Sequence, residues 1–170
     1  NAGEKMFAYL FEGYWKDVGT INSLWEANMD LLGENPAFDV SDSEWKIHSR
    51  NPLAPPEYLG ANASVRNSMI ALGCEVYGSV ENSLLSSNVV IEEGASVSDS
   101  VIMSGTVIKS GARIRYSIID ENVVVDSDVC VGEEKGKGIT VLGRNITVGK
   151  GAVVKGGEII DKNIEAGVKI

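Results

Sequence analysis

The architecture of this chain is set by residues 91–125, which read IEEGASVSDSVIMSGTVIKSGARIRYSIIDENVVV. Aliphatic residues recur in this stretch every five or six positions, as at Ile91, Val97, Ile102 and Ile108. An amphipathic helix would place its apolar residues three or four positions apart. A period near six predicts instead a coil of short strands, each of which turns one aliphatic side chain inward.

The same period continues on both sides of this stretch. Every third inward position falls in one predicted column at a constant spacing, and one such column joins Cys74, Ile91, Ile108 and Val125. Three sides of about six residues then form one coil, and equivalent side chains of successive coils stack inside a triangular tube. The sequence therefore predicts a mainly β fold, a parallel β-helix or hexapeptide-repeat solenoid. The predicted inward residues are Cys74, Val80, Leu85, Ile91, Val97, Ile102, Ile108, Ile114, Ile119, Val125 and Val131.

Two further patterns support this prediction. Small or β-branched residues stand two positions before many inward residues and share their face, because side chains alternate along a strand; they are Ala95, Ala112, Val123 and Ala152. A serine recurs on the five-residue side of each coil, at Ser68, Ser83, Ser100 and Ser117. The repeat stops at residues 133–138, which read EEKGKG and offer no apolar side chain to the interior. We expect this segment to loop out of one coil as a solvated charge run, with a functional loop as the alternative.

Composition excludes several classes of protein. The 170 residues are 44% hydrophobic and 23% charged, which is typical of a soluble globular chain. No stretch approaches the length of a membrane span, and no basic and apolar leader opens the chain. A net charge of −9 disfavours a general nucleic-acid binder. Two cysteines, Cys74 and Cys130, favour a reducing cytoplasm over a disulfide scaffold.

The first sixty residues do not follow the repeat. Residues 6–11 read MFAYLF and predict a strand rich in aromatic residues. Thr20 is a good N-cap for a helix that begins at Ile21 and stops near Gly33. The apolar face of this helix comprises Ile21, Leu24, Trp25, Met29 and Leu32. One strand and one helix cannot bury their own apolar faces, so this part either belongs to a larger domain or folds back on the solenoid.

A resemblance becomes specific between the predicted strand and the helix. Residues 14–20 read YWKDVGT and residues 25–31 read WEANMDL. These motifs resemble the closing segment of the catalytic domain in bacterial glucose-1-phosphate adenylyltransferase (ADP-glucose pyrophosphorylase), and the resemblance covers the whole chain. It divides the chain into a remnant of a nucleotidyltransferase catalytic domain (1–33), an extended linker that holds all four prolines (34–60), and a left-handed β-helix domain (61–170). The left-handed sense is implied by the family, since crossovers between parallel strands are generally right-handed.

The resemblance implies a cytoplasmic enzyme that converts ATP and glucose 1-phosphate to ADP-glucose and pyrophosphate for glycogen synthesis. It also implies an allosterically controlled tetramer. Asp17 would help to hold the catalytic Mg²⁺, an ion that prefers carboxylates and substrate phosphates; without the family, Asp17 is a charge that suits a helix start. The neighbouring Tyr14 and Trp15 are expected to be packing residues. The family's Gly-rich nucleotide loop has no match here, so we expect a C-terminal fragment with no catalytic residue, inactive alone, whose missing domain binds both substrates.

Basic residues gather in the second half of the chain, where residues 101–170 carry ten of the fifteen Lys and Arg. Solubility and cross-strand pairing explain most of this charge. The alternative is a site for a phosphate-bearing effector, a sugar phosphate or a nucleotide, because Arg suits phosphate contacts. The candidates for such a site are Arg113, Arg115, Lys135, Lys137 and Arg144.

Two functions from different classes therefore remain. The chain is the regulatory and oligomerisation part of an adenylyltransferase, or it is the structural β-helix module of a non-catalytic partner subunit. The single histidine, His48, excludes a zinc site with three His ligands and disfavours an acyltransferase with a His base. The sequence is still apolar at Val168 and Ile170, and unpaired strand edges need a cover, so we expect a homo- or hetero-oligomer formed through the solenoid.

Overall fold

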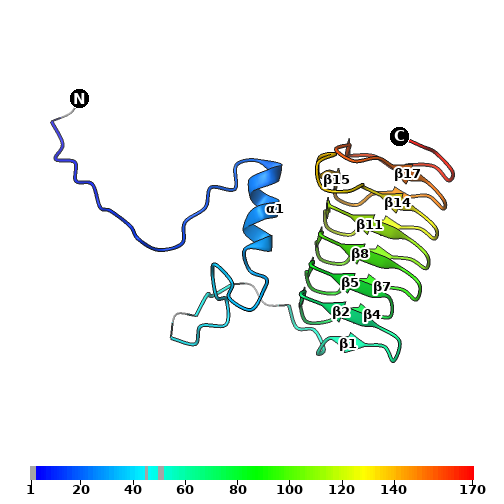
Figure 1. Ribbon diagram of the computed structural model, residues 1–170, viewed down its shortest axis with the longest axis horizontal. Coiled ribbons are helices and arrows are strands. Elements are labelled where there is room, and N and C mark those ends of the chain that lie inside the picture. Colours follow the sequence, from blue (N-terminus) through cyan, green and yellow to red (C-terminus); the bar gives the residue numbers. More distant parts are fainter. Residues whose placement is uncertain (1–2, 45, 50–51) are drawn as a thin grey trace.

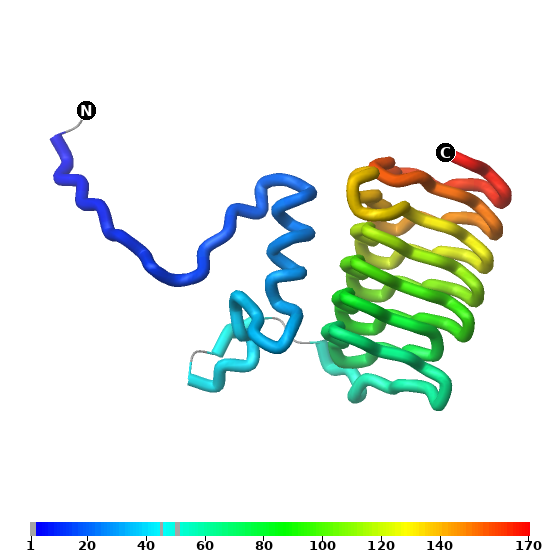
Figure 2. The backbone as a smooth tube through the Cα atoms, in the orientation of Figure 1, coloured from blue at the N-terminus to red at the C-terminus, as the bar shows by residue number. Residues whose placement is uncertain are grey.

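The computed structural model describes residues 3–44, 46–49 and 52–170. In these residues the chain forms one helix, α1 (Ile21–Met29), and a solenoid of short parallel strands with about six turns (Figure 1). The mainly β, parallel solenoid predicted from the repeat is therefore confirmed, while its left-handed sense stays a prediction. The tube in Figure 2 shows the coils stacked on one another, with α1 beside them and the first residues extending away.

Each coil contributes one strand to each of three six-stranded parallel sheets, which we call sheets A, B and C. Sheet A contains β1 (Tyr58–Leu59), β4 (Glu75–Val76), β7 (Val90–Ile91), β10 (Val107–Ile108), β13 (Val124–Val125) and β16 (Thr147–Val148). Sheet B contains β2 (Ser64–Arg66), β5 (Ser79–Glu81), β8 (Ser96–Ser98), β11 (Arg113–Arg115), β14 (Cys130–Val131) and β17 (Val153–Val154). Sheet C contains β3 (Met69–Ile70), β6 (Leu84–Leu85), β9 (Val101–Ile102), β12 (Ser117–Ile119), β15 (Thr140–Leu142) and β18 (Ile159–Ile160).

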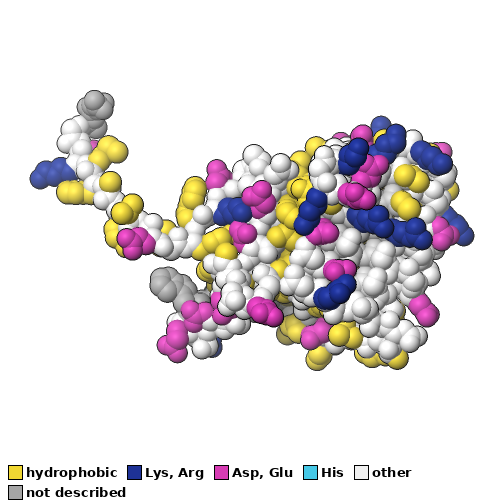
Figure 3. Space-filling model, viewed as in Figure 1, with side chains coloured by type: hydrophobic (Ala, Val, Ile, Leu, Met, Phe, Trp, Pro, Cys, Tyr) yellow, Lys and Arg dark blue, Asp and Glu magenta, His cyan; other side chains and the backbone are white. Residues whose placement is uncertain are grey.

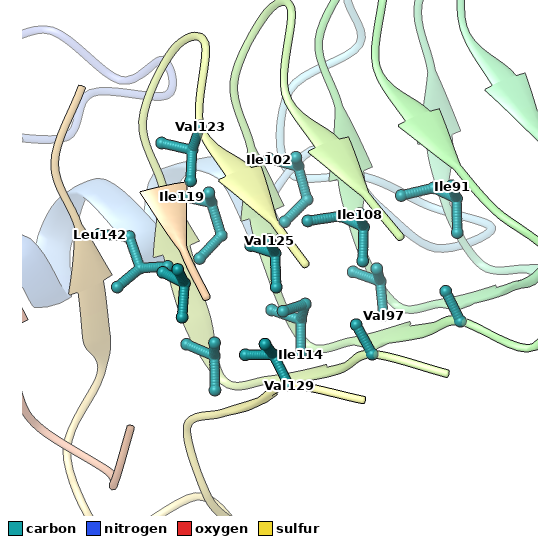
Figure 4. Packing of buried hydrophobic residues seen from close by; sticks show 14 of the residues in the cluster. Ile91, Val97, Ile102, Ile108, Ile114, Ile119, Val123, Val125, Val129 and Leu142 are labelled. Atoms are coloured by element: carbon teal, nitrogen blue, oxygen red, sulfur yellow. The ribbon is translucent and has the colours of Figure 1, made fainter. Parts of the chain in front are cut away.

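The core consists of aliphatic columns that run along the inside of the three sheets (Figure 4). In sheet B, Val80, Val97, Ile114 and Val131 stand in direct register and are almost completely buried. All eleven residues predicted to point inward are buried. A buried Val or Ile stabilises the fold by roughly 1.5–3 kcal/mol, so the stacked columns are the main source of stability.

The register corrects the place predicted for Cys74. Cys74 is buried, but Val76 rather than Cys74 pairs with Ile91 in sheet A. The prediction assumed coils of constant length, whereas the step from Val76 to Ile91 is two residues shorter than the step from Ile91 to Ile108. The first pairings of the other two sheets are shortened in the same way. The first pairing of sheet A, Leu59↔Val76, keeps the longer step, so the shortening lies at the corner between β4 and β5. Cys74 takes the inward position two residues before the column.

The recurring serines form a ladder of hydroxyl groups inside the corner between sheets B and C. Ser83 Oγ accepts the backbone N–H of Ser100 at 3.0 Å, and Ser100 Oγ accepts that of Ser117 at 3.1 Å. Each hydroxyl also donates to a carbonyl two residues back, as Ser100 does to Ser98 at 2.7 Å. The ladder satisfies backbone groups that the bend removes from the sheets, which a buried corner requires.

Residues 133–138 leave the coil between β14 and β15, as predicted, and they are exposed. We call them the inserted loop. In sheet C, Ile118 pairs with Val101 of the preceding coil and with Val141 of the following one, and the second step is longer than the first by the length of this loop. The solenoid begins with β1, and its last coil is joined by two isolated bridges, Val148↔Ile164 and Val153↔Lys169. Ile170 packs against the core and is not left open.

Helix α1 packs on the outer face of sheet C, so it folds back on the solenoid. Trp25 is the buried residue of the helix, and it contacts a cluster formed by Val101, Ile118 and Ile139. Thr20 is the N-cap, as predicted, and it forms a capping box with Ser23.

The structure differs from two predictions for the first residues. Residues 6–11 form no strand and are exposed; an extended segment needs neighbouring strands to be stable, and the described residues offer it none. The helix ends at Met29 with Asp30 as C-cap, before the predicted stop at Gly33.

Candidate functional site

An open groove of about 860 Å³ follows the corner between sheets B and C. Equivalent positions of successive coils line it, because stacked strands lie about 4.8 Å apart and repeat their side chains at that spacing. The inserted loop closes one end with Glu133, Glu134 and Lys135. We call this hollow the corner groove. Its remaining lining residues are Arg66, Asn67, Glu81, Asn82, Ser98, Asp99, Arg115 and Tyr116.

The bottom of the corner groove is a chain of polar contacts from coil to coil. Asn67 Nδ2 donates to Asn82 Oδ1 at 2.8 Å, and Asn82 Nδ2 donates to Asp99 Oδ1 at 2.6 Å. Asp99 Oδ1 also forms an ion pair with Lys135 Nζ at 2.9 Å. The charged groups here are partly exposed, so each ion pair contributes no more than about 1 kcal/mol to stability.

The structure brings together three of the five basic residues proposed for an effector. Arg115 lines the corner groove with Lys135, and it lines an adjoining hollow of about 430 Å³ with Lys137. Glu133 and Glu134 line both hollows, so the local charge is mixed. Figure 3 shows the same pattern at the scale of the surface, where dark blue basic side chains gather on one face of the solenoid with magenta acidic ones among them.

The other two basic residues lie outside this group. Arg113 is on the same strand and the same outer face as Arg115, on the other side of the buried Ile114. Arg144 is at a different corner, after β15, where it forms ion pairs with Asp120 at 3.9 Å and Glu121 at 3.4 Å.

Asp17 lies in an exposed turn before α1, and its Oδ1 accepts the backbone N–H of Gly19 at 2.9 Å. Mg²⁺ usually takes one or two carboxylates together with substrate phosphates. The Asp17 carboxylate is exposed and accepts one backbone hydrogen bond, so it has a free oxygen with which it can serve as one ligand of such an ion. Among the described residues, no group of three or more His, Cys, Asp and Glu side chains is placed to hold a metal ion, so any further ligands must come from elsewhere.

The segment that carries Asp17 is tied to helix α1. Lys16 Nζ contacts Asp30 at 2.8 Å and Glu26 at 3.2 Å, and the Tyr14 hydroxyl donates to Asp30 at 2.9 Å. The hydrogen bond from Lys16, together with that from Tyr14, lowers the pKa of Asp30 below its ordinary value. Tyr14 and Trp15 were both predicted to be packing residues. Tyr14 does pack, since its ring stacks on Phe38 with 5.7 Å between the ring centroids. Trp15 does not, since it is 77% exposed.

Sequence reasoning missed two residues that join α1 to the solenoid. Trp25 Nε1 donates to the backbone carbonyl of Asp99 at 2.8 Å, and the Trp25 ring meets the Tyr116 ring edge-on at 4.9 Å. Both Asp99 and Tyr116 have left-handed backbone angles, like Asn67 and Asn82 at the same corner of earlier coils. The replacement of Asn by Asp and Tyr at this repeating position was the signal that could have identified them.

Comparisons with known proteins match two parts of the chain to family models and to curated relatives. Residues 1–34 match the family model described as nucleotidyl transferase, and residues 57–140 match the one described as GlmU-like, C-terminal hexapeptide. The chain is 58% identical over 89 residues to glucose-1-phosphate adenylyltransferase of Clostridium beijerinckii, which covers 52% of this chain and 23% of that protein. The enzymes of the same name from Clostridium perfringens (strain SM101) and Clostridium kluyveri are each 53% identical, over 95 and 91 residues, which cover 56% and 54% of this chain and 24% of each relative. The resemblance to the glucose-1-phosphate adenylyltransferases is confirmed.

The chain spans about a quarter of the length of these adenylyltransferases. The two matched ranges leave residues 35–56 between them, and this interval contains all four prolines. The range matched to nucleotidyl transferase contains Asp17 and helix α1, whereas the hexapeptide range contains Asp99, Arg115 and Lys135. Contacts of Trp25 with Asp99 and Tyr116 therefore join the range that matches nucleotidyl transferase to the range that matches the hexapeptide model. In the described residues, no helix is long and apolar enough to cross a membrane.

Proposed function

We propose that this chain is part of a glucose-1-phosphate adenylyltransferase that makes ADP-glucose and pyrophosphate from ATP and glucose 1-phosphate for glycogen synthesis. The identity of 53–58% to proteins of that name carries this proposal. The match of residues 1–34 to a nucleotidyl transferase model adds support from a second kind of comparison. Both substrates would bind mainly to a catalytic domain outside these residues.

Asp17 would contribute one carboxylate to a catalytic Mg²⁺ in the complete protein. Such an ion would neutralise charge on the ATP phosphates and so favour attack by the sugar phosphate. The residues of this chain fix where that carboxylate stands. Lys16, next to Asp17 in the sequence, is held by Asp30 and Glu26, and these belong to a helix that is packed on the solenoid. The solenoid thereby supports the segment that carries the proposed ligand.

The solenoid would also bind a phosphate-bearing effector, a sugar phosphate or a nucleotide, at the corner groove. Arg115, Lys135 and Lys137 supply the positive charge, and Arg113 adds to it from the same face. Guanidinium groups form paired hydrogen bonds with phosphate oxygens, which suits such a ligand. Arg144 is tied to Asp120 and Glu121 at another corner and would take no part.

Pyrophosphate release from ATP and glucose 1-phosphate tests the enzymatic part of the proposal. The 170-residue chain is expected to release none, and a longer protein that includes the catalytic domain is expected to release it in a Mg²⁺-dependent way. In the longer protein, Asp17→Asn should lower kcat, while Asp42→Asn should not. A longer protein that binds the substrates without turnover would instead favour the non-catalytic partner subunit.

Calorimetry with fructose 1,6-bisphosphate and with AMP tests the effector site. The heat of binding is expected for at least one of them and should be lost in Arg115→Ala. Arg144→Ala is the matched control, because it removes the same charge at a corner outside the groove. Equal loss in both variants, or no heat with the longer protein, would contradict the assignment of the corner groove.

A further inference from the structure

Helix α1 is held on the solenoid by a small set of contacts centred on Trp25. The indole donates a hydrogen bond to the Asp99 carbonyl, its ring meets Tyr116 edge-on, and Lys135 Nζ lies 5.4 Å from its ring centroid. Trp25 is only 9% exposed. A cation over an indole face is attracted by the negative face of the ring. Lys135 therefore touches both sides of the contact, since it also pairs with the Asp99 carboxylate.

The residue type at this corner changes in the coils that contact Trp25, and only Tyr116 departs from the types that favour a left-handed backbone. Asn67 and Asn82 have φ of 44° and 47°, a region that asparagine tolerates well. The next two coils place Asp99 and Tyr116 there, at φ of 49° and 42°. A left-handed backbone is strained for tyrosine, because its Cβ crowds the following carbonyl oxygen. The substitution away from asparagine occurs in the two coils that contact Trp25, so the strained residue serves the docking of the helix.

The inserted loop brings Lys135 to this place. Gly136 and Gly138 have φ of 105° and 93°, angles that side chains with a Cβ rarely adopt, so the loop can fold back sharply along the corner. The Lys135 side chain is 58% exposed and that of Asp99 is 34% exposed. Water and ions reach the pair, and the contact can open without unfolding the coil that carries it.

We propose that the inserted loop acts as a latch for helix α1. In this latch Lys135 holds the helix on the solenoid, because its charge bridges the Asp99 carboxylate and the Trp25 ring. When the latch is open, α1 keeps its apolar contacts but separates from sheet C more often. Because Lys16 is tied to Asp30 and Glu26, each opening also displaces the segment that carries Asp17. This last consequence rests on the proposed function, whereas the latch itself rests only on the contacts of the described residues.

Hydrogen exchange of the 170-residue chain tests the latch without any assay of activity. Lys135→Gln should speed the exchange of α1 amides about 3- to 10-fold, as expected for the loss of a partly exposed ion pair and a cation–π contact. Lys137→Gln is the matched control, because it removes the same charge from the same loop and should leave α1 unchanged. Amides of β8 and β11 should exchange at the original rate in both variants.

Asp99→Asn provides a second variant that preserves the fold, since asparagine occupies the same corner in the two preceding coils. It removes the carboxylate while leaving an amide that can continue the side-chain ladder. It should speed α1 exchange by no more than Lys135→Gln does, because the contact of Lys135 with the Trp25 ring remains. The double variant should exceed Lys135→Gln by no more than about 2-fold, because that variant has already lost the ion pair. Equal exchange of α1 in Lys135→Gln and Lys137→Gln, or fully additive effects in the double variant, would overturn the proposal.

Discussion

Tyr116 shows how one side chain can serve two elements at once. Its backbone stands at a corner that favours asparagine, and its ring supports Trp25. We predict that Tyr116→Asn will increase hydrogen exchange in α1 while leaving the solenoid at least as stable as before, because the backbone strain is relieved. The two effects can be read from α1 and β11 amides in one experiment. A solenoid destabilised together with the helix would show that the ring is part of the solenoid core.

The two thiols of the chain differ in how far they are buried. Burial raises the pKa of Cys74, and its Sγ lies 3.0 Å from the Ser86 carbonyl, whereas Cys130 is half-buried on the outer side of β14. Thiolates are the reactive form, so we predict that a thiol reagent labels Cys130 in the native chain and Cys74 only after unfolding. Mass spectrometry of labelled peptides distinguishes the two. Labelling of Cys74 at the rate of Cys130 would contradict the buried position.

At the scale of elements, the stability of a coil depends on the columns that cross it. Ile114 is completely buried in the middle of sheet B, so we predict that Ile114→Ala lowers the free energy of unfolding by about 2–5 kcal/mol. Arg113→Ala, one residue away and pointing outward, should change it by no more than about 0.5 kcal/mol. Urea unfolding measures both. Equal effects would mean that stacking inside the tube does not dominate.

The tie between residue 16 and helix α1 should depend on pH. The pKa of Asp30 in the folded chain is lowered. The ionised carboxylate therefore contributes fully to folding stability above the ordinary carboxyl pKa, and this stability is lost as the pH falls through the lowered value. We predict that Lys16→Met raises the pKa of Asp30 towards the ordinary value, as followed by carboxyl carbon shifts in NMR. Lys5→Met, at an exposed position, should not. An Asp30 pKa unaffected by Lys16→Met would show that the ion pair does not form in solution.

The regular elements could be predicted from the sequence because the period of the aliphatic residues is the period of the coil. The same rule misplaced Cys74, since a shortened coil keeps its aliphatic spacing locally and changes only the pairing partner. The strand at residues 6–11 was predicted wrongly because an aromatic-rich pattern states a preference for pairing without supplying the partner. The grouping of Arg115 with Lys135, and the separation of Arg144, required knowledge of which corner each residue occupies.

At the scale of the whole molecule, the two ends of the solenoid differ. The last coil is joined to the preceding one by two isolated parallel bridges, whereas β1 presents Tyr58 and Leu59, both about half exposed, on the outermost strand of sheet A. We predict that the chain associates through this edge, and that Leu59→Asp shifts sedimentation equilibrium at micromolar concentration towards the monomer. Ile159→Asp, a similarly exposed apolar site on β18, is the control. A wild-type chain that sediments as a stable monomer would contradict association through the solenoid.

Short, regular and long coils all close the same three-sided figure, because the difference in length is absorbed at a corner and never within a strand. A corner can therefore accept additional residues without a change in the core. The inserted loop between β14 and β15 shows this, because the inward residues on either side of it stay in register. A lineage can therefore gain or lose a peptide at such a bend in one genetic event and acquire a new surface while the rest of the tube is built as before.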